Sequence, residues 1–572
     1  MITVALLCAV SWDYRTLFYD IGLTVSPPDS SLCGDVSLVV SSAPSDTLPF
    51  HLTSNYSIDS LLYNGASAGF VRNSDTVFVL VAAPTDPCTL RVFYHGKTGD
   101  RGLHFRDSTF FTFGQFYDSK AWIPCNDTPC AKAPARLRVT VPPGCFVASN
   151  GVLDSVRNST FFWTESHPVA PYLLVVAGGP YVQLDTSWSG IPIHYYVFAG
   201  DTAKARASFA HVPDMLGSYS GNFGLYPFTD EKLAFVETED PIGMETQTCI
   251  MVGSHTITGD LGMEFVFAHE LAHQWWGDAL TPRSWGEIWL NEGFAAWSDF
   301  TYTENAYGAD SALSRWLWAR GLYFSEDSIR QYPLRNPTYF TGATVYYKGA
   351  WVVRMLRWVM GDSLFFEGLR FYHGMYADSI VDTDDFESAM EYVAGTCFIW
   401  FFSEWCEDVS YPVVEYNWSQ VADTVYLTFH QAQVHGPCFT MPVEILMVAG
   451  PDSTRDTVWM DSPCDTFALC PGFAVGELVM DPEYRVLMLA ERVSSTPETS
   501  RGPAGIRLAT VGRTLWVENS TPGPVELRAY DVSGRLALCR EVPRGQSEIR
   551  LPGTGIYRVI WRGGSRSVVI TR

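Results

Sequence analysis

The sequence predicts a multidomain α+β protein, in which an N-terminal antiparallel β domain precedes a mainly helical domain, a small β-sandwich and a C-terminal immunoglobulin-like β module. Three observations support this prediction. A chain of 572 residues is too long for one hydrophobic core. Its apolar residues change from alternation to a helical repeat and back again along the chain. A stretch rich in Ser, Thr, Pro and Gly (SSTPETSRGPAG) separates an Arg-rich end from the acidic remainder.

The first two segments are predicted from their apolar patterns. Residues 1–18 begin with the apolar run MITVALLCAVS, which has the length of a signal-peptide core, and we expect a signal remnant there. A first buried strand is the alternative, because no basic residue precedes the run. Residues 19–186 contain short β-rich runs such as TVFVLVAA and ARLRVTVP between Gly, Pro, Asn and Asp, which predicts the antiparallel β domain.

The remaining segments follow in order. Residues 187–411 show helical periodicity, for example in SALSRWLWARGLYF and YKGAWVVRMLRWVM. Alternation returns over 412–492, in runs such as TVYLTFHQAQV, and predicts the β-sandwich. Residues 493–505 are expected to be a linker, and 506–572 a separate β module, because the charge reverses there.

Composition excludes some classes of partner. The net charge of −24 and the low isoelectric point disfavour nucleic acid, because phosphate binding needs a basic face. No run of 18 or more apolar residues occurs, so we expect no membrane-spanning helix. Thirteen cysteines are many for a cytosolic enzyme, and close pairs such as Cys125 with Cys130 are either disulfides or free thiols.

The segment HELAH contains the residues of a metal site. On a helix, His269 and His273 lie on the same face, and Glu270 projects beside them. Glu292, in the following helical segment WLNEGFAAW, supplies a third ligand. Two His and one Glu leave the fourth zinc position open for water, as in catalytic sites. We therefore predict one zinc ion per chain, because an ordinary helix would bury these polar residues without partners.

These motifs resemble the zinc aminopeptidase family of aminopeptidase N and leukotriene hydrolase, over residues 19–492. HELAHQWWGD with WLNEGFAAW is similar to the family's gluzincin signature. AWIPCNDTPCAKAPARLRVTVP resembles a block of its N-terminal domain, and PIGMET resembles its GxMEN exopeptidase motif. The resemblance implies a thermolysin-like catalytic domain over 187–411, and peptides with a free N-terminus as substrates.

The resemblance also implies roles for individual residues. Glu270 is the expected general base, and it would take a proton from the metal-activated water. Tyr346, in TVYYKGAW, matches the family's oxyanion donor, and its neighbour Tyr347 is the alternative assignment.

Substrate binding is implied for four further residues. Glu245 would bind the substrate's α-ammonium, and Gly243 and Met244 would lie along its backbone. Gln115 matches a second amine contact of some members.

Two departures from the family leave other functions open. Thr246 occupies the position of the motif's Asn. The long C-terminal helical domain of larger members is not recognisable, so we expect a more open cleft. A zinc endopeptidase is therefore the first alternative function. A catalytically silent binding protein on the same fold is the second, although it would have no need for a general base and an oxyanion donor.

The last segment resembles the sorting domain of bacterial proteins exported by the type IX system. The matching stretches are YDVSGR, GIYRV and the terminal SRSVVITR. A generic immunoglobulin-like or carbohydrate-binding module is the alternative. The resemblance implies a bacterial protein that the export machinery carries outside the cell, onto its surface or into the periplasm.

Overall fold

The computed structural model consists of two compact units, and each is described by itself. It describes residues 14–42, 45–106, 109–240, 243–493, 506–511, 514–519, 523–531, 536–551, 555–561 and 564–570. The first unit contains the chain up to Trp316 together with His373–Asp382, and the second contains Leu317–Tyr372 and the chain from Thr383 onward. No helix in these described ranges is long and apolar enough to cross a membrane.

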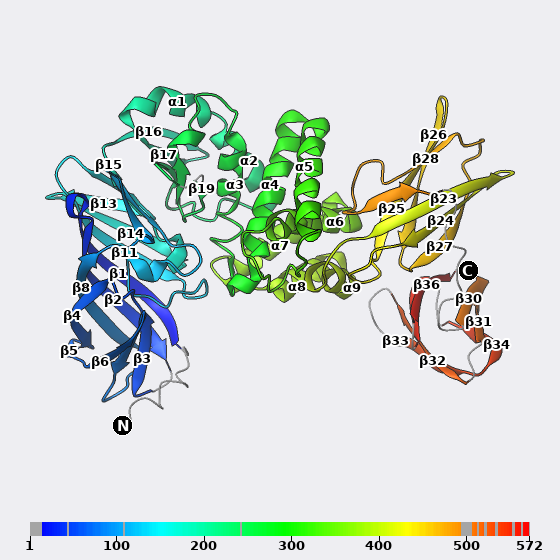
Figure 1. Ribbon diagram of the computed structural model, residues 1–572, viewed down its shortest axis with the longest axis horizontal. Coiled ribbons are helices and arrows are strands. Elements are labelled where there is room, and N and C mark those ends of the chain that lie inside the picture. Colours follow the sequence, from blue (N-terminus) through cyan, green and yellow to red (C-terminus); the bar gives the residue numbers. More distant parts are fainter. Residues whose placement is uncertain are drawn as a thin grey trace. The chain divides into compact units, whose positions relative to one another are not determined.

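The first unit begins with a β domain of three sheets (Figure 1). Its largest sheet has the order β13 (Val152–Arg157), β14 (Thr160–Val169), β11 (Ala133–Thr140), β1 (Tyr14–Ser26), β2 (Ser31–Ser42), β8 (Cys88–Lys97), β4 (Tyr56–Tyr63) and β5 (Ala66–Ser67). The second contains β12 (Phe146–Ser149), β15 (Val176–Gly179), β10 (Thr109–Phe113) and β9 (Gly102–Arg106). The third contains β3 (Thr47–His51), β7 (Thr76–Leu80) and β6 (Phe70–Asn73).

Two details of this β domain differ from the prediction. β1 pairs with β11 in parallel, so the largest sheet is mixed rather than wholly antiparallel. Tyr14 pairs with Ser42 and Thr16 with Val40, so residues 14–18 belong to a strand and not to a signal remnant. Residues 1–13 lie outside the described residues. The pairing of β1 with two neighbours places it inside the sheet, where its apolar residues are buried.

A second, five-stranded sheet supports the helices of the first unit. Its order is β16 (Tyr181–Trp188), β17 (Ile191–Phe198), β18 (Leu233–Thr238), β20 (Cys249–Gly253) and β19 (Gly243–Met244). β16 pairs with β17, so this domain begins near residue 181 and not at 187. Helical periodicity did not reveal the sheet, because β18 and β20 are buried along their whole length and therefore do not alternate. The prediction of a mainly helical segment was incomplete here.

Two helices of the first unit lie between β17 and β18 in the chain, and the others follow β20. The helices are α1 (Thr202–Ser208), α2 (Val212–Phe223), α3 (Glu264–Ala272) and α4 (Trp289–Tyr307), and α5 (Ala309–Asp327) begins in this unit. The short strands β21 (Thr281–Pro282) and β22 (Ile380–Val381) pair in parallel. α4 is buried on all sides from Trp289 to Thr303, as expected of a helix that crosses the centre of a domain.

The second unit contains the remaining helices and two groups of strands. It contains the end of α5, then α6 (Gly349–Met360), most of α7 (Asp362–Tyr376, of which the residues from His373 belong to the first unit), α8 (Thr383–Ala394) and α9 (Ile399–Phe402). One sheet contains β27 (Cys464–Leu469), β24 (Thr424–Gln431), β23 (Val413–Val421) and β29 (Leu489–Arg492), and another contains β26 (Asp452–Met460), β25 (Met441–Ala449) and β28 (Glu477–Met480). Alternating burial along β24 and β25 shows that each sheet buries one face.

The C-terminal segment forms two further sheets. They contain β30 (Ile506–Val511), β31 (Thr514–Asn519) and β34 (Gly545–Arg550), and β33 (Leu536–Val542), β32 (Val525–Asp531), β35 (Gly555–Trp561) and β36 (Gly564–Ile570). Buried residues from both sheets, such as Leu515, Leu527 and Val559, form one hydrophobic cluster. The predicted linker 493–505 lies outside the described residues except for Val493.

The twelve described cysteines are all free thiols. The suggested pair of Cys125 with Cys130 is therefore not bonded, and neither are the similarly spaced Cys397 with Cys406 and Cys464 with Cys470.

His167 links the β domain to the helical part of the first unit. Its Nδ1 lies 3.1 Å from Asp378 and its Nε2 2.9 Å from Asp230. The hydrogen bond to Asp378, with a second one to Asp230, raises the pKa of His167 to about 9. The protonated form is therefore the one that the folded state favours.

We expect His167→Gln to destabilise the first unit in a pH-dependent way. Because the folded-state pKa lies above the unfolded value of 6.5, the contribution is complete below pH 6.5 and is lost as the pH rises through about 9. Both carboxylates are partly exposed, so the effect should be about 1 kcal/mol. Urea midpoints followed by tryptophan fluorescence should differ between wild type and variant at low pH and converge above pH 9. An equal difference at both pH values would contradict the ion-pair explanation.

Candidate active site

The three predicted metal ligands converge in the first unit. His269 lies on α3, His273 directly follows the last residue of that helix, and Glu292 lies in the first turn of α4. Their nearest atoms form a triangle. The Nε2 atoms of the two histidines are 3.2 Å apart. The Oε2 atom of Glu292 lies 3.4 Å from Nε2 of His269 and 3.5 Å from Nε2 of His273. Tetrahedral zinc with bonds of about 2.0–2.1 Å needs ligand atoms about 3.3 Å apart. The donor atoms therefore fit one zinc ion.

Outer contacts orient the two imidazoles. His273 Nδ1 lies 3.0 Å from the carbonyl oxygen of Trp276, which can only accept, so Nδ1 carries the proton and Nε2 has its lone pair free for a metal. The Asp299 carboxylate lies 3.7 Å from His269 Nδ1, and Asp299 is held in turn by Arg315 at 2.6 Å. These contacts fix the ring orientation that a metal requires.

Glu270 lies beside the ligand triangle and is also buried. Burial is the main cause that raises the pKa of Glu270, to about 7, and a cation beside it would lower this value. Gly243, at the start of β19, approaches it so closely that a Cβ there would lie 2.1 Å from Glu270 Oε1. A side chain at this position would displace the Glu270 carboxylate, so β19 passes close to it.

Glu245 follows β19 and is almost fully buried. Carboxylate oxygens of Glu245 and Glu270 and a ring nitrogen of His273 all lie within 4.8 Å of one another. Asn291 Nδ2 donates to Glu245 Oε1 at 3.1 Å and thereby orients the carboxylate. Burial raises the pKa of Glu245. A positively charged group that binds beside Glu245 would lower this pKa again and favour the ionised carboxylate.

Thr246, the departure from the GxMEN pattern, turns away from this carboxylate. Its hydroxyl donates to the carbonyl of Cys249, the first residue of β20. The substitution therefore ties the loop after β19 to the start of β20. Met244 is buried in β19, the edge strand of its sheet, so one side of β19 is available to an added strand.

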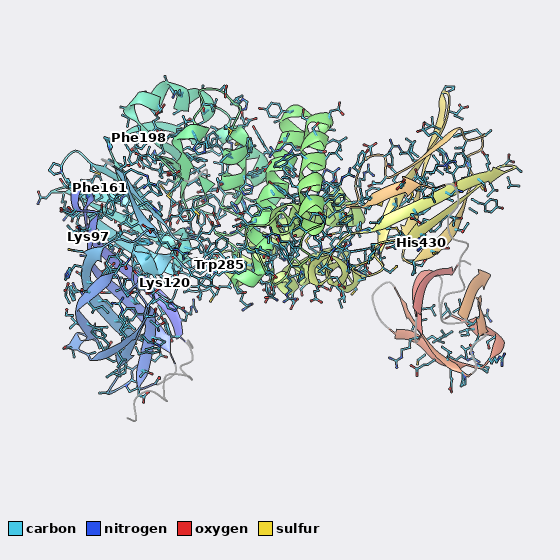
Figure 2. All side chains as sticks on the ribbon, in the orientation of Figure 1. Lys97, Lys120, Phe161, Phe198, Trp285 and His430 are labelled. Atoms are coloured by element: carbon cyan, nitrogen blue, oxygen red, sulfur yellow. The ribbon has the colours of Figure 1, made fainter. Side chains whose placement is uncertain are left out.

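Gln115 comes from the N-terminal β domain but reaches the same centre. Its Nε2 donates to Glu292 Oε1 at 3.4 Å. The next two residues, Phe116 and Tyr117, have left-handed φ angles of 54° and 72°, which bulky residues rarely adopt. Both rings contact Trp285, labelled in Figure 2, with centroids 4.9 and 6.0 Å away. The sequence predicted the glutamine but not its contact with a metal ligand.

Tyr346 lies in the second unit, within the π-helical turn Thr344–Lys348 that precedes α6. Glu326 fixes the start of this turn, because it accepts hydrogen bonds from the backbone N–H and the hydroxyl of Thr344, at 2.7 and 3.0 Å. Tyr347 packs its ring against Trp318, with centroids 5.2 Å apart. The two tyrosines thus differ in their surroundings.

The sequence analysis did not identify the residues that orient the predicted site residues. Asn291 stands next to Glu292 in the motif, but nothing in the pattern indicated that it bonds to Glu245. Its amide also donates to the hydroxyl of Tyr172 at 3.4 Å. Gly277, with φ of 123°, leaves room for it, since a Cβ there would lie 2.4 Å from Asn291 Oδ1. These contacts come from segments far apart in the chain, so local spacing does not reveal them.

Comparison with known proteins identifies the domain that contains these helices. Residues 209–405 match the family model described as peptidase family M1 domain. Aminopeptidase M1 of Arabidopsis thaliana is 26% identical over 380 residues, covering 57% of this chain and 41% of the relative. Aminopeptidase B of Mus musculus is 28% identical over 302 residues, covering 49% and 46%. The chain thus spans less than half the length of these curated relatives.

Solved structures show the same fold. The structure of aminopeptidase A of Legionella pneumophila has a TM-score of 0.75 at 17% identity, covering 85% of this chain and 61% of that one. An M1 zinc metallopeptidase of Deinococcus radiodurans has a TM-score of 0.62 at 24% identity, covering 69% and 94%. Residues 209–405 thus match the domain of peptidase family M1, the chain shares the fold of solved M1 zinc metallopeptidases, and its three donor atoms fit one zinc ion.

Proposed function

We propose that the protein is a zinc-dependent aminopeptidase that releases N-terminal residues from peptides. One observation carries the proposal: Glu245, a buried carboxylate outside the ligand triangle, lies beside Glu270 and His273. Hydrolysis of an internal peptide bond does not require the carboxylate of Glu245 in addition to the general base Glu270. An exopeptidase needs it, because the substrate's α-ammonium must be held one residue away from the bond that is cleaved. Relatives named aminopeptidases support the same function.

The proposed binding mode follows from the edge strand. The substrate backbone lies along Gly243 and Met244 as an added strand, and its ammonium donates to Glu245. Gln115, next to Glu292, limits the space on the other side. The scissile carbonyl then lies over Glu270, whose carboxylate a side chain at Gly243 would displace.

In the proposed mechanism, Glu270 moves the proton. When bound, zinc supplies a Lewis acid that polarises the carbonyl and makes water acidic. Glu270 accepts the proton of the attacking water as the C–O bond forms, and then gives it to the amine nitrogen as the C–N bond breaks. The products are one amino acid and a peptide with a new N-terminus. Tyr346 is proposed as the donor to the oxyanion.

Paired fluorogenic peptides test the function. We expect purified protein to cleave a peptide with a free N-terminus and to leave its N-acetylated twin intact, and a zinc chelator should abolish the cleavage. Glu270→Gln should lower kcat by about 10² to 10⁴. Glu245→Gln should mainly raise KM for the free peptide and lower kcat/KM by about tenfold or more, because a charge-assisted bond to the ammonium is lost.

The same assay distinguishes the alternatives. Cleavage of both peptides would identify an endopeptidase and remove the role of Glu245. Cleavage of neither, by protein shown to contain zinc, would favour a binding protein without catalytic activity.

The two tyrosines of the π-helical turn form a matched pair. Tyr346→Phe should lower kcat by about 10² to 10³ with little change in KM, because a hydrogen bond made only in the transition state is lost. Tyr347→Phe, which keeps the ring that packs on Trp318, should retain nearly full activity. A larger loss in Tyr347→Phe would reverse the assignment.

We further propose that the C-terminal β module directs export of a bacterial protein to the outside of the cell. Its own hydrophobic cluster, and the motifs in which it resembles a type IX sorting domain, support the proposal. We also propose that this module has an immunoglobulin-like fold. A reporter protein fused to residues 494–572 should appear in the medium or on the surface of a host with that export system. Retention of the fusion inside such a host would refute the role.

A further inference from the structure

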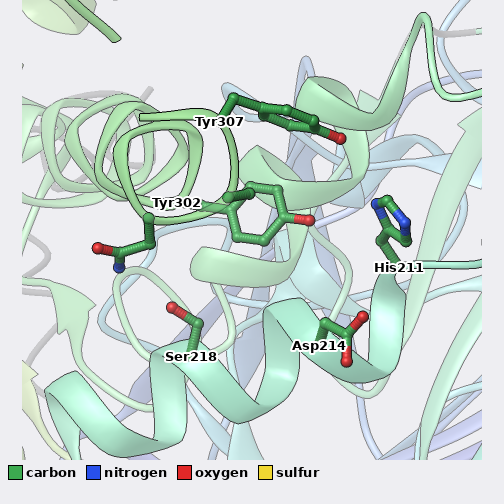
Figure 3. Close-up of a pocket in the computed structure, with 7 residues that line it drawn as sticks. His211, Asp214, Ser218, Tyr302 and Tyr307 are labelled. Atoms are coloured by element: carbon green, nitrogen blue, oxygen red, sulfur yellow. The ribbon is translucent and has the colours of Figure 1, made fainter. Parts of the chain in front are cut away.

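A pocket of about 340 Å³ opens on the first unit, formed by residues that do not belong to the ligand triangle (Figure 3). α2 contributes Asp214 and Ser218, His211 precedes that helix, and α4 contributes Tyr302 and Tyr307 from its last turns. This volume is at the lower end of the range of small-molecule sites. The pocket therefore has room for a group of the size of one side chain or a little more.

The pocket carries negative charge without a fixed counter-ion. Within the described residues, the Asp214 side chain forms no ion pair or hydrogen bond. Glu264, the first residue of α3, is buried near Tyr302, pairs with His211 through Nδ1 at 3.1 Å and is hydrogen-bonded to the side chain of Tyr307. Two carboxylates thus face one imidazole. An anion would be repelled here, whereas a cation would be attracted.

The hydroxyl of a largely buried tyrosine points into the same space. Tyr302 is only 5% exposed, and its hydroxyl forms no hydrogen bond with the residues that the structure describes. Figure 3 shows the ring across the middle of the pocket, with the hydroxyl directed toward His211 and Asp214. The hydroxyl is therefore accessible from the pocket. A ligand with an N–H donor would satisfy its oxygen.

The walls favour an organic cation over a metal ion. Tyr302 and Tyr307 offer aromatic faces, which attract ammonium and guanidinium groups. In the described part of the chain, side chains at metal-ligand spacing form two groups, and both include His273 at the catalytic centre. His211, Asp214 and Glu264 do not form such a group.

We propose that this pocket is an accessory binding site for an organic cation, a guanidinium or primary ammonium group. The Asp214 carboxylate pairs with the cation, the Tyr302 oxygen accepts one of its N–H groups, and the Tyr307 ring lies against it. A bound cation contacts α2, the beginning of α3 and the end of α4. It thereby connects the two helices that carry His269, His273 and Glu292.

The test uses the whole protein and two amide probes without a free α-ammonium, which Glu245 would not bind. N-acetyl-L-arginine amide has a guanidinium but no free α-ammonium, and N-acetyl-L-citrulline amide is its neutral isostere. Spermidine represents a free amine. Because it has free ammonium groups, only the binding that Asp214→Asn removes is assigned to this pocket. Each is titrated by calorimetry or ligand-observed NMR into wild type, Asp214→Asn, Tyr302→Phe and, as a control of equal charge change, Asp423→Asn in the turn between β23 and β24.

We expect the arginine amide to bind and the citrulline amide not to. Asp214→Asn, which removes the charge, should weaken the affinity for the arginine amide by about tenfold. Tyr302→Phe should also weaken it, and Asp423→Asn should leave it unchanged. Tighter binding of the arginine amide than of spermidine indicates a peptide side chain as the natural ligand, and the reverse indicates a free amine.

Three results would overturn the proposal. They are equal binding of the two amides, an unchanged affinity in Asp214→Asn, and no saturable binding at millimolar concentrations. Asp214 is exposed, so its variant should fold even if Tyr302→Phe does not.

Discussion

The fixed separation of α3 and α4 is the constraint on which the site depends. Three ligand atoms on two helices must lie about 3.3 Å apart for tetrahedral zinc, and a small shift of either helix would break the triangle. Aromatic packing holds the helices in place. Trp276, just after α3, contacts Phe294 of α4 at 5.0 Å and Phe223 of α2 at 5.2 Å between ring centroids. Because close-packed rings leave no room for sliding, the ligand geometry is rigid.

The same packing concentrates negative charge in a dry environment. Glu245, Glu270, Glu292 and Asp299 are all buried around two imidazoles. Burial raises the pKa of Glu245 and of Glu270, and repulsion from neighbouring carboxylates raises both further. This arrangement is unfavourable until cations are present. A metal ion and a substrate ammonium are both cations, so the electrostatics of the centre favour the ligands of the proposed reaction.

The N-terminal β domain is part of the same structural unit as this centre. The ammonium of Lys132, on the segment leading into β11, is buried and donates to the carbonyls of Asp278 and Ala279 at 2.9 and 3.1 Å. Asn150 donates to the carbonyl of Gln247, in the loop after Glu245, at 2.6 Å. Buried hydrogen bonds of this kind are costly to break. The domain therefore supports the loop that carries Glu245 and brings Gln115 to Glu292.

The sequence by itself determined what local geometry controls. Helical spacing placed His269 and His273 on one face, and alternation identified the β domain and the sandwich, because both periods are properties of the backbone. Tertiary structure alone decided the rest: the strand at Tyr14, the sheet containing β18 and β20, the contact of Asn291 with Glu245, and the pocket at Tyr302. These features join segments many residues apart. No local period encodes such a pairing, since it depends on how whole surfaces pack together.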